Sequence, residues 1–296
     1  MNGRPEPREL LYEGKAKQVY ACDDTDVVIV RYKDDATAFN AQKRGTVSEK
    51  GVVNNAVSAM LYAELEAFGV PTHFIEQLSQ REQLVRRVSI VPVEVIVRNR
   101  AAGTFAVRYG VDEGLELDPT VVEWCFKNDA LSDPPMNTAT AVALGLADEL
   151  QLEAMFEYAA DINDYLSARF AVADLELIDF KLEFGIDAAG ELRLADEISP
   201  DTCRLWDVAS GEKMDKDRFR RDLGGVEEAY QEVWRRLRET QELPLDLPDH
   251  DEAEFEHQHL HELDELDGDD APGALDGPGG LDGLGAERPR PGERRD

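Results

Sequence analysis

One stretch of the sequence decides how the second half of the chain folds: Leu175-Glu176-Leu177-Ile178-Asp179-Phe180-Lys181-Leu182-Glu183-Phe184-Gly185. Between positions 178 and 184, apolar residues alternate with charged ones. Because successive side chains of a strand point to opposite faces, this alternation predicts a β-strand with Asp179, Lys181 and Glu183 on one face. Taken alone, the alternation favours a half-buried strand whose charged face is only solvated.

A second strand follows the first across a short turn. Residues 191–195 alternate again, and Ala189-Gly190 supplies the turn. A loop of two or of four residues gives the same register, and both place Glu183 directly opposite Asp196. Facing carboxylates repel each other unless a cation lies between them, and Mg²⁺ takes one or two carboxylates while water and phosphate oxygens complete its shell. The pattern leaves a metal site and a plain hairpin equally open.

Around this hairpin the chain divides into two predicted lobes. Short strand patterns and one helix, at Gly51–Phe68, indicate a β-rich first lobe at residues 1–90. In residues 91–241, helical periodicity predicts helices over 147–170 and 217–237 beside the hairpin. We therefore expect an α+β fold with antiparallel sheets and packed helices.

The remaining residues, 242–296, differ from the rest in composition. They hold 18 acidic residues against four basic ones, with Pro and Gly interspersed. Such a segment cannot bury a core, so we expect a disordered acidic tail. The formal net charge of the whole chain is -31. A field of that sign repels nucleic acid and anionic membranes, and we expect neither as a partner.

The expected location is the cytoplasm. The three cysteines are far apart and lack metal-like spacing, which suits a reducing compartment. The N-terminus has no apolar signal region, and no window approaches eighteen apolar residues.

A first candidate binding motif is the stretch Leu11–Tyr20, which reads as strand, tight turn and strand. Gly14 allows a close approach of the backbone, and Lys15 and Lys17 add charge at the bend. Such a hairpin can lie over a triphosphate, with N–H groups and ammonium groups facing the anion. In isolation the motif is also typical of a plain basic turn.

A second candidate motif combines arginine with a hydroxyl. A predicted strand ends at Arg98 and is followed by Gly103 and Thr104, while Arg204 comes shortly after the hairpin. Arginine recognises phosphate with two parallel hydrogen bonds, so an anionic ligand is indicated. The alternative is a surface ion pair between Glu94 and Arg98.

Together these segments resemble the SAICAR synthetase family over roughly residues 9–240. The resemblance rests on six runs in the family's order: Tyr-Glu-Gly-Lys-Ala-Lys at 12–17, Val-Arg-Asn-Arg-Ala-Ala-Gly at 97–103, Lys-Asn-Asp at 127–129 with Asp-Pro at 133–134, Asp-Phe-Lys-Leu-Glu-Phe-Gly at 179–185, Asp-Glu-Ile-Ser-Pro-Asp at 196–201 and Met-Asp-Lys-Asp-Arg-Phe-Arg at 214–220. It implies a two-lobed fold related to ATP-grasp and kinase folds. It also implies that ATP, Mg²⁺, L-aspartate and the carboxylated aminoimidazole ribonucleotide CAIR react through an acyl phosphate to give SAICAR.

The resemblance also implies roles for individual residues. Gly14, Lys15 and Lys17 would hold the ATP phosphates, and Glu183 and Asp196 would ligate Mg²⁺. The catalytic residues Asp133, Asp179 and Lys181 would organise the base and carboxylate of CAIR, with Lys127 as a further substrate-binding residue. Arg98, Thr104 and Arg204 would bind the ribose 5-phosphate; the family usually has serine where this chain has Thr104. For L-aspartate, the candidates are Lys33, Asp34 and Asn40.

Two other classes of protein share part of this pattern. A small-molecule kinase would share the phosphate hairpin and the paired carboxylates but would not need aspartate. A non-catalytic binding module with an acidic tail would form no ADP. The partners that we expect are the three small-molecule substrates, and the chain could also form a homo-oligomer.

Overall fold

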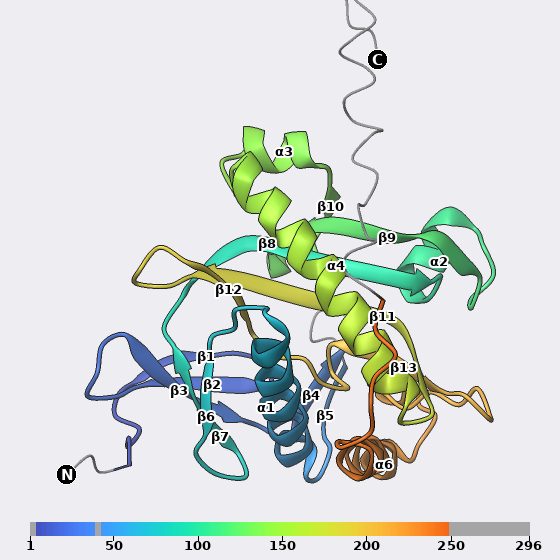
Figure 1. The fold of residues 1–296 in the computed structure, drawn as a ribbon, viewed down its shortest axis with the longest axis horizontal. Helices are drawn as coiled ribbons and strands as arrows, with labels where there is room; N and C mark the ends of the chain where they lie inside the picture. Colours follow the sequence, from blue (N-terminus) through green and yellow to red (C-terminus); the bar gives the residue numbers. More distant parts are fainter. Residues whose placement is uncertain (1–3, 39–42, 249–296) are drawn as a thin grey trace, which may run out of the picture. The chain divides into compact units, whose positions relative to one another are not determined.

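The computed structural model describes residues 4–38 and 43–248, and its first part is an antiparallel sheet. The strand order in this sheet is β1-β2-β3-β7-β6. The strands are β1 (Leu10–Glu13), β2 (Lys17–Ala21), β3 (Val27–Tyr32), β6 (Phe74–Gln77) and β7 (Glu82–Arg86). A separate two-stranded sheet pairs β4 (Asp35–Ala38) with β5 (Lys43–Thr46). Figure 1 shows these strands in blue and teal beside helix α1 (Lys50–Phe68).

The second sheet contains the predicted strand that carries Asp179, Lys181 and Glu183. Its order is β10-β9-β8-β11-β12, and β13 pairs with β11 as well. The strands are β8 (Ser89–Arg100), β9 (Glu116–Phe126), β10 (Pro135–Met136), β11 (Leu175–Ile186), β12 (Leu192–Ala195) and β13 (Cys203–Asp207). Strand β9 was not predicted; it contains Pro119, and most of its residues before Trp124 are exposed or only partly buried, so its apolar pattern is weak. The expected antiparallel α+β architecture is confirmed.

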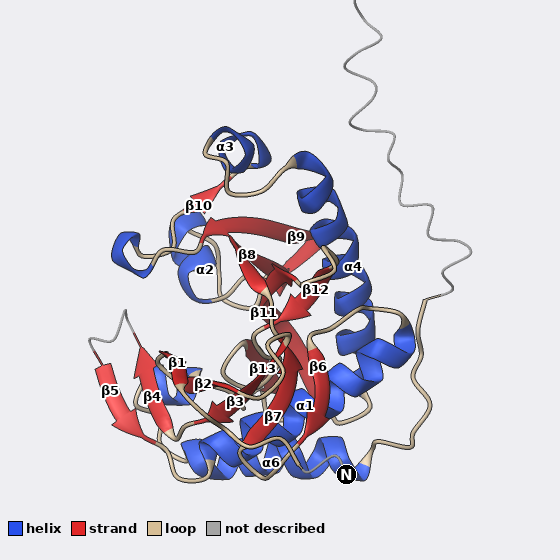
Figure 2. Ribbon diagram, turned by 90° about the vertical axis from the view of Figure 1, so that its left-hand side faces the viewer, coloured by secondary structure: helices blue, strands red, loops and turns tan. Residues whose placement is uncertain are grey.

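Helices cover the second sheet and fill the space beside the first. The long helix α4 (Glu149–Ala171) begins at a capping box formed by Asp148 and Gln151, and it packs on β11 and β8. Figure 2 shows it along the outer side of the second sheet. The shorter helices are α2 (Gly103–Tyr109), α3 (Thr138–Ala143), α5 (Asp217–Arg220) and α6 (Val226–Glu239), with a 3-10 turn at Asp129–Leu131.

The prediction of a single helix over residues 217–237 was wrong. The structure divides it into α5 and α6, and the residues between them include Gly224 and Gly225, which have φ angles of 72° and 59°. Such angles are in the left-handed region that glycine adopts without strain, so they end one helix and allow the next to start in another direction.

One hydrophobic core joins elements of both predicted lobes. It contains Val57 of α1, Ile162 of α4 and Val233 of α6 together with residues of the second sheet, such as Val95. The first sheet ends with β7 at Arg86, and the second begins with β8 at Ser89. This connection lies next to the predicted boundary at residue 90. This core contains residues from both 1–90 and 91–241. The division of the chain into these two lobes therefore stays a prediction.

The first residues of the predicted tail, 242–248, are described by the structure, and the boundary at residue 242 stays a prediction. Leu245 and Leu247 are partly buried and pack against the main core, so the chain stays attached to the fold at least that far. The rest of the predicted disordered tail, residues 249–296, lies outside the described residues. In the part of the chain that the structure describes, no helix has the length and apolarity that a membrane crossing would need.

Candidate active site

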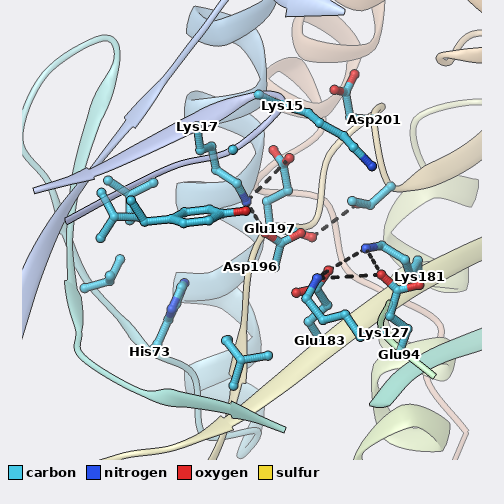
Figure 3. Close-up of a pocket in the computed structure, with 18 of the residues that line it drawn as sticks. Lys15, Lys17, His73, Glu94, Lys127, Lys181, Glu183, Asp196, Glu197 and Asp201 are labelled. Atoms are coloured by element: carbon cyan, nitrogen blue, oxygen red, sulfur yellow. Dashed lines mark hydrogen bonds and ion pairs between the residues drawn. The ribbon is translucent and has the colours of Figure 1, made fainter. Parts of the chain in front are cut away.

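A cavity of about 820 Å³ brings together the predicted phosphate hairpin and the charged face of β11. The β1–β2 hairpin, β8, β11 and the loop after β12 all contribute to its wall. Figure 3 shows their charged side chains pointing toward one another. The charged residues of the wall include Lys15, Lys17, Glu94, Lys127, Asp129, Asp133, Lys181, Glu183, Asp196, Glu197, Asp201, Lys216 and Arg220.

On the floor of the cavity, two carboxylates share one ammonium group. Lys181 donates to Glu183 at 2.5 Å and to Glu94 at 2.8 Å, and Lys127 donates to Glu183 at 2.7 Å. Glu94 lies directly opposite Glu183 in the β8–β11 register. Burial raises the pKa of Glu94, whereas the three surrounding carboxylates, which include Asp196, outweigh burial and hold the pKa of Lys181 well above its usual value. The site is therefore a buried cluster of alternating charges.

The predicted register between Glu183 and Asp196 was wrong. Glu183 pairs with Ala195, one position earlier, because the loop of the hairpin contains five residues. The Asp187 carboxylate accepts hydrogen bonds from the backbone N–H groups of Ala189 and Glu191 and so stabilises this longer loop. Asp196 nevertheless lines the same cavity as Glu183. Its φ of 61° ends the strand and changes the direction of the chain there.

The two lysines of the hairpin reach across the cavity. Lys15 donates to Asp129 at 2.6 Å, and Lys17 forms ion pairs with Asp196 and Glu197. Burial opposes the charge of Lys17, but the two carboxylates outweigh this effect and raise its pKa. Burial likewise disfavours the Asp196 carboxylate, and Lys17 and Lys181 outweigh it, so the pKa of Asp196 is lowered. Both groups are charged at neutral pH.

A smaller cavity of about 190 Å³ adjoins the first and is lined by the predicted phosphate-binding residues. Arg98 and Arg204 donate to the same oxygen of Asp179, at 2.9 and 2.7 Å. Thr104 also lines this cavity. Gly103 has a φ of 53°, and a Cβ atom there would lie 2.5 Å from a nitrogen of Arg204, so glycine leaves room for this guanidinium.

The two cavities are continuous in their walls. Lys181, Asp201, Thr202 and Arg220 line both of them. The alternative that Arg98 forms an ion pair with Glu94 is not realised, since Arg98 is paired with Asp179 and Glu123.

The remaining candidates from the sequence differ in where they lie. Asp133 lines the large cavity and accepts a hydrogen bond from the backbone N–H of Asn128. Lys33 is paired with Glu13 and Asp35 and is not among the residues that line either cavity. Asp34 likewise holds Arg81 and the N–H of Gly51, and Asn40 lies outside the described residues.

Sequence reasoning assigned no site role to several charged groups of the large cavity, among them Glu94, Glu197 and Asp201. The sequence did contain a signal for Glu94. Its predicted strand could be expected to pair with the strand that carries Asp179, Lys181 and Glu183. Burial raises the pKa of Glu197, and Lys17 only partly offsets this effect. Among the described residues, no group of three His, Cys, Asp or Glu side chains is arranged to hold a metal ion by itself.

Comparisons with known proteins agree with this arrangement. A model of the SAICAR synthetase family matches residues 10–237. The phosphoribosylaminoimidazole-succinocarboxamide synthase of Deinococcus radiodurans is 61% identical over 229 residues, which cover 77% of this chain and 97% of that protein. The enzyme of the same name from Clostridium botulinum strain Eklund 17B is 55% identical, with 78% and 99% covered.

Solved structures are similar as well. The phosphoribosylaminoimidazole-succinocarboxamide synthase of Ehrlichia chaffeensis has a TM-score of 0.76 and 43% identity, with 78% of this chain and 98% of that chain covered. A SAICAR synthetase in complex with ADP has a TM-score of 0.75 and 42% identity, with 77% and 97% covered. The chain therefore belongs to the SAICAR synthetase family, the ligases that use ATP to join L-aspartate to CAIR in purine biosynthesis.

Proposed function

We propose that the large cavity binds ATP with Mg²⁺, that the small cavity binds the phosphate end of CAIR, and that the two substrates react where the cavities meet. The observation that carries this proposal is the shared wall: Lys181 and Arg220 line both cavities. A nucleotide in one cavity and CAIR in the other would therefore present their reacting groups to each other.

The wall of the large cavity has an apolar part and a charged part, and a nucleotide needs both. Valine side chains of β2, β3 and β7 form an apolar part of its wall, where a purine base can be buried: Val19, Val28, Val30 and Val85. Lys15 and Lys17 belong to the charged part of the wall, where ammonium groups and the N–H groups near Gly14 can face phosphates. The relative solved with ADP supports the same use here.

The carboxylates of the large cavity suit a magnesium ion. Glu94 and Glu183 already converge on one cationic group, the ammonium of Lys181, so this donor set accommodates positive charge. Mg²⁺ prefers oxygen ligands and keeps waters and phosphate oxygens, so Glu183 and Asp196 are sufficient protein ligands. When bound, the ion would neutralise charge on the phosphates of ATP.

The small cavity suits a phosphate monoester. Arg98 and Arg204 are held in place by Asp179, which fixes their planar guanidinium groups before a ligand arrives. The hydroxyl of Thr104 can donate a further hydrogen bond to a phosphate oxygen.

In the proposed reaction, a carboxylate oxygen of CAIR attacks the γ-phosphorus of ATP and ADP leaves. The amine of aspartate then attacks the carbon of the acyl phosphate, inorganic phosphate leaves, and the nitrogen loses a proton as the amide forms. Positioning and charge neutralisation do most of the work in phosphoryl transfer. Lys127 and Lys181 lie where the new negative charge would develop.

Three further parts of the proposal concern the setting of the enzyme. We place the enzyme in the cytoplasm. We expect no nucleic-acid partner, because the net charge of -31 repels polyanions. Assembly into a homo-oligomer stays a prediction.

The test measures release of ADP and phosphate by the wild-type enzyme with ATP, Mg²⁺ and CAIR, with and without L-aspartate. We expect phosphate release and SAICAR formation only with aspartate, and loss of both after chelation of Mg²⁺. A small-molecule kinase would instead form a stable phosphorylated product without aspartate, and a binding module would form no ADP. Either result would refute the proposal.

A further inference from the structure

Five lysines line the large cavity, and one of them differs from the others. Lys15, Lys127 and Lys181 each donate to a carboxylate at 2.7 Å or less, and Lys17 is paired with Asp196 and Glu197. The fifth, Lys216, reaches its carboxylate, Asp201, only at 3.3 Å.

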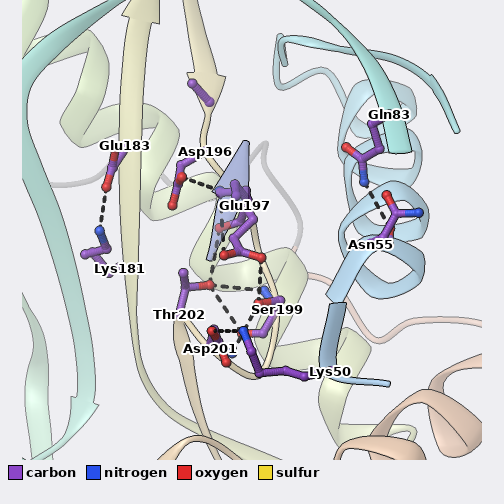
Figure 4. A network of polar contacts seen from close by, with 12 residues as sticks. Lys50, Asn55, Gln83, Lys181, Glu183, Asp196, Glu197, Ser199, Asp201 and Thr202 are labelled. Carbon is purple, nitrogen blue, oxygen red and sulfur yellow. Dashed lines mark hydrogen bonds and ion pairs between the residues drawn. The ribbon is translucent and has the colours of Figure 1, made fainter. Parts of the chain in front are cut away.

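The carboxylate near Lys216 is already occupied by other donors. Lys50 donates to Asp201 at 2.7 Å, and the hydroxyl of Tyr230 donates at 2.6 Å. The side chain of Lys50 is 1% exposed, so this ion pair is fully buried. Figure 4 shows Lys50 directed at Asp201 from below the loop after β12. Each oxygen of Asp201 thus already accepts one short hydrogen bond. Among the described residues, the only side-chain hydrogen bond of Lys216 is the long one to Asp201, so most of its donor capacity is available to a ligand.

The surroundings of Lys216 make an anionic ligand favourable. Its side chain is only 16% exposed. Burial lowers the pKa of Lys216, and the long contact with Asp201 offsets this effect only in part. A carboxylate bound beside the ammonium would stabilise its charged form. The backbone N–H of Lys216 donates to the carbonyl of Pro200, which holds the residue at the cavity wall.

The position of Lys216 identifies the ligand. Lys216 lines the large cavity and donates to Asp201, which lines both cavities, so Lys216 lies beside the wall that they share. Under the proposed function, the amine of L-aspartate must reach the acyl carbon where the cavities meet. The two carboxylates of aspartate then need cationic partners that the nucleotide and CAIR do not use.

We infer that Lys216 binds a carboxylate of L-aspartate, and that the pairing of Lys50 and Tyr230 with Asp201 keeps this ammonium available. The inference rests on the proposed function, since it assigns one substrate of that same site.

The experiment compares Lys216→Gln with the matched control Lys213→Gln. Lys213 is three residues away, pairs with Glu113 at 3.5 Å and is absent from the walls of both cavities. For Lys216→Gln we expect KM for aspartate to rise about 10- to 100-fold, because a charge-assisted hydrogen bond is lost. KM for ATP and CAIR should change less than about threefold. The control should resemble the wild type.

A second measurement uses succinate, a dicarboxylate without the reacting amine, as a competitive inhibitor against aspartate. Its inhibition constant should rise with KM for aspartate in Lys216→Gln and recover in part in Lys216→Arg. Equal losses for ATP, CAIR and aspartate, or an unchanged inhibition constant, would overturn the inference. Unchanged ADP affinity shows that the variant is folded. If the wild type needs no aspartate, the proposed function itself fails.

Discussion

The two adjoining cavities differ in the side chains that carry most of their positive charge. The large cavity is lined by five lysines and by carboxylates that share them, whereas the small cavity relies on Arg98 and Arg204, both held by Asp179. An ammonium group is a compact charge on a flexible stem, and a guanidinium is a planar fork with fixed donors. The difference indicates that groups change partners in the large cavity while the small one holds its ligand in a constant position.

This contrast fits the proposed chemistry. In that proposal, a phosphoryl group would be transferred in the large cavity and Mg²⁺ would replace ammonium groups beside Glu183, so adaptable contacts would be useful there. The phosphate of CAIR takes no part in bond making, and a rigid arginine pair can hold it throughout the reaction. Variants in each cavity should therefore differ in which kinetic constant they change.

The largest effect is expected in the large cavity, for Glu183→Gln. The amide cannot balance Lys127 and Lys181, and it removes a proposed ligand of Mg²⁺. We expect kcat to fall about 100- to 1000-fold, the range seen when one electrostatic contact to a transition state is removed. Aspartate-dependent phosphate release measures it. Glu76→Gln, on an exposed position of β6, is the control. A variant with normal kcat would contradict the assignment.

A smaller effect is expected in the small cavity, for Arg204→Lys. The charge is kept, but the contacts to Asp179 and Asp217 lose their fixed geometry. We expect KM for CAIR to rise about 10- to 100-fold, with little change in KM for ATP. Arg235→Lys on the exposed face of α6 serves as the comparison. An equal rise of both KM values would mean that the cavities are not divided between the two substrates.

Acid sensitivity should arise in the large cavity, at His73. Burial, and then the charge of Lys17, lowers the pKa of this imidazole to about 3. In the unfolded chain it titrates near 6.5, so protons bind to the unfolded state first as the pH falls. The stabilisation is present above pH 6.5 and decreases below it, by about 2 kcal/mol at pH 5.

The substitution His73→Phe should remove this part of the pH dependence. Urea unfolding at pH 5 and pH 7.5, for wild type and variant, measures the difference. The free energy of unfolding should decrease less on acidification in the variant. An identical decrease in both proteins would show that His73 is not the group responsible.

The smallest effect is expected at Thr104 in the small cavity. Thr104→Ser keeps the hydroxyl and should leave KM for CAIR within about twofold. Thr104→Val removes one hydrogen bond to a phosphate oxygen, so KM should rise about 3- to 10-fold. A rise with serine as large as with valine would show that the methyl group, and not the hydroxyl, is what matters.

Local patterns were enough to place several elements of the fold. Strand β11 followed from alternation alone, and helices α1 and α4 followed from their periodicity, because each buries one continuous face. Strand β9 and the break between α5 and α6 did not follow. Pairing with β8 keeps β9 in the sheet despite Pro119, and the turn at Gly224 depends on backbone angles that helical periodicity does not reveal.

For the site, the sequence by itself determined which residues carry charge and which strand presents them. Asp179, Lys181 and Glu183 share one face because side chains alternate along any strand. Tertiary structure alone decided their partners. A one-residue difference in loop length moved Asp196 out of register with Glu183, and the pairing of β8 with β11 put Glu94 opposite instead. Lys216 gained its role only through Lys50 and Tyr230, which are distant in sequence and meet at Asp201 through packing.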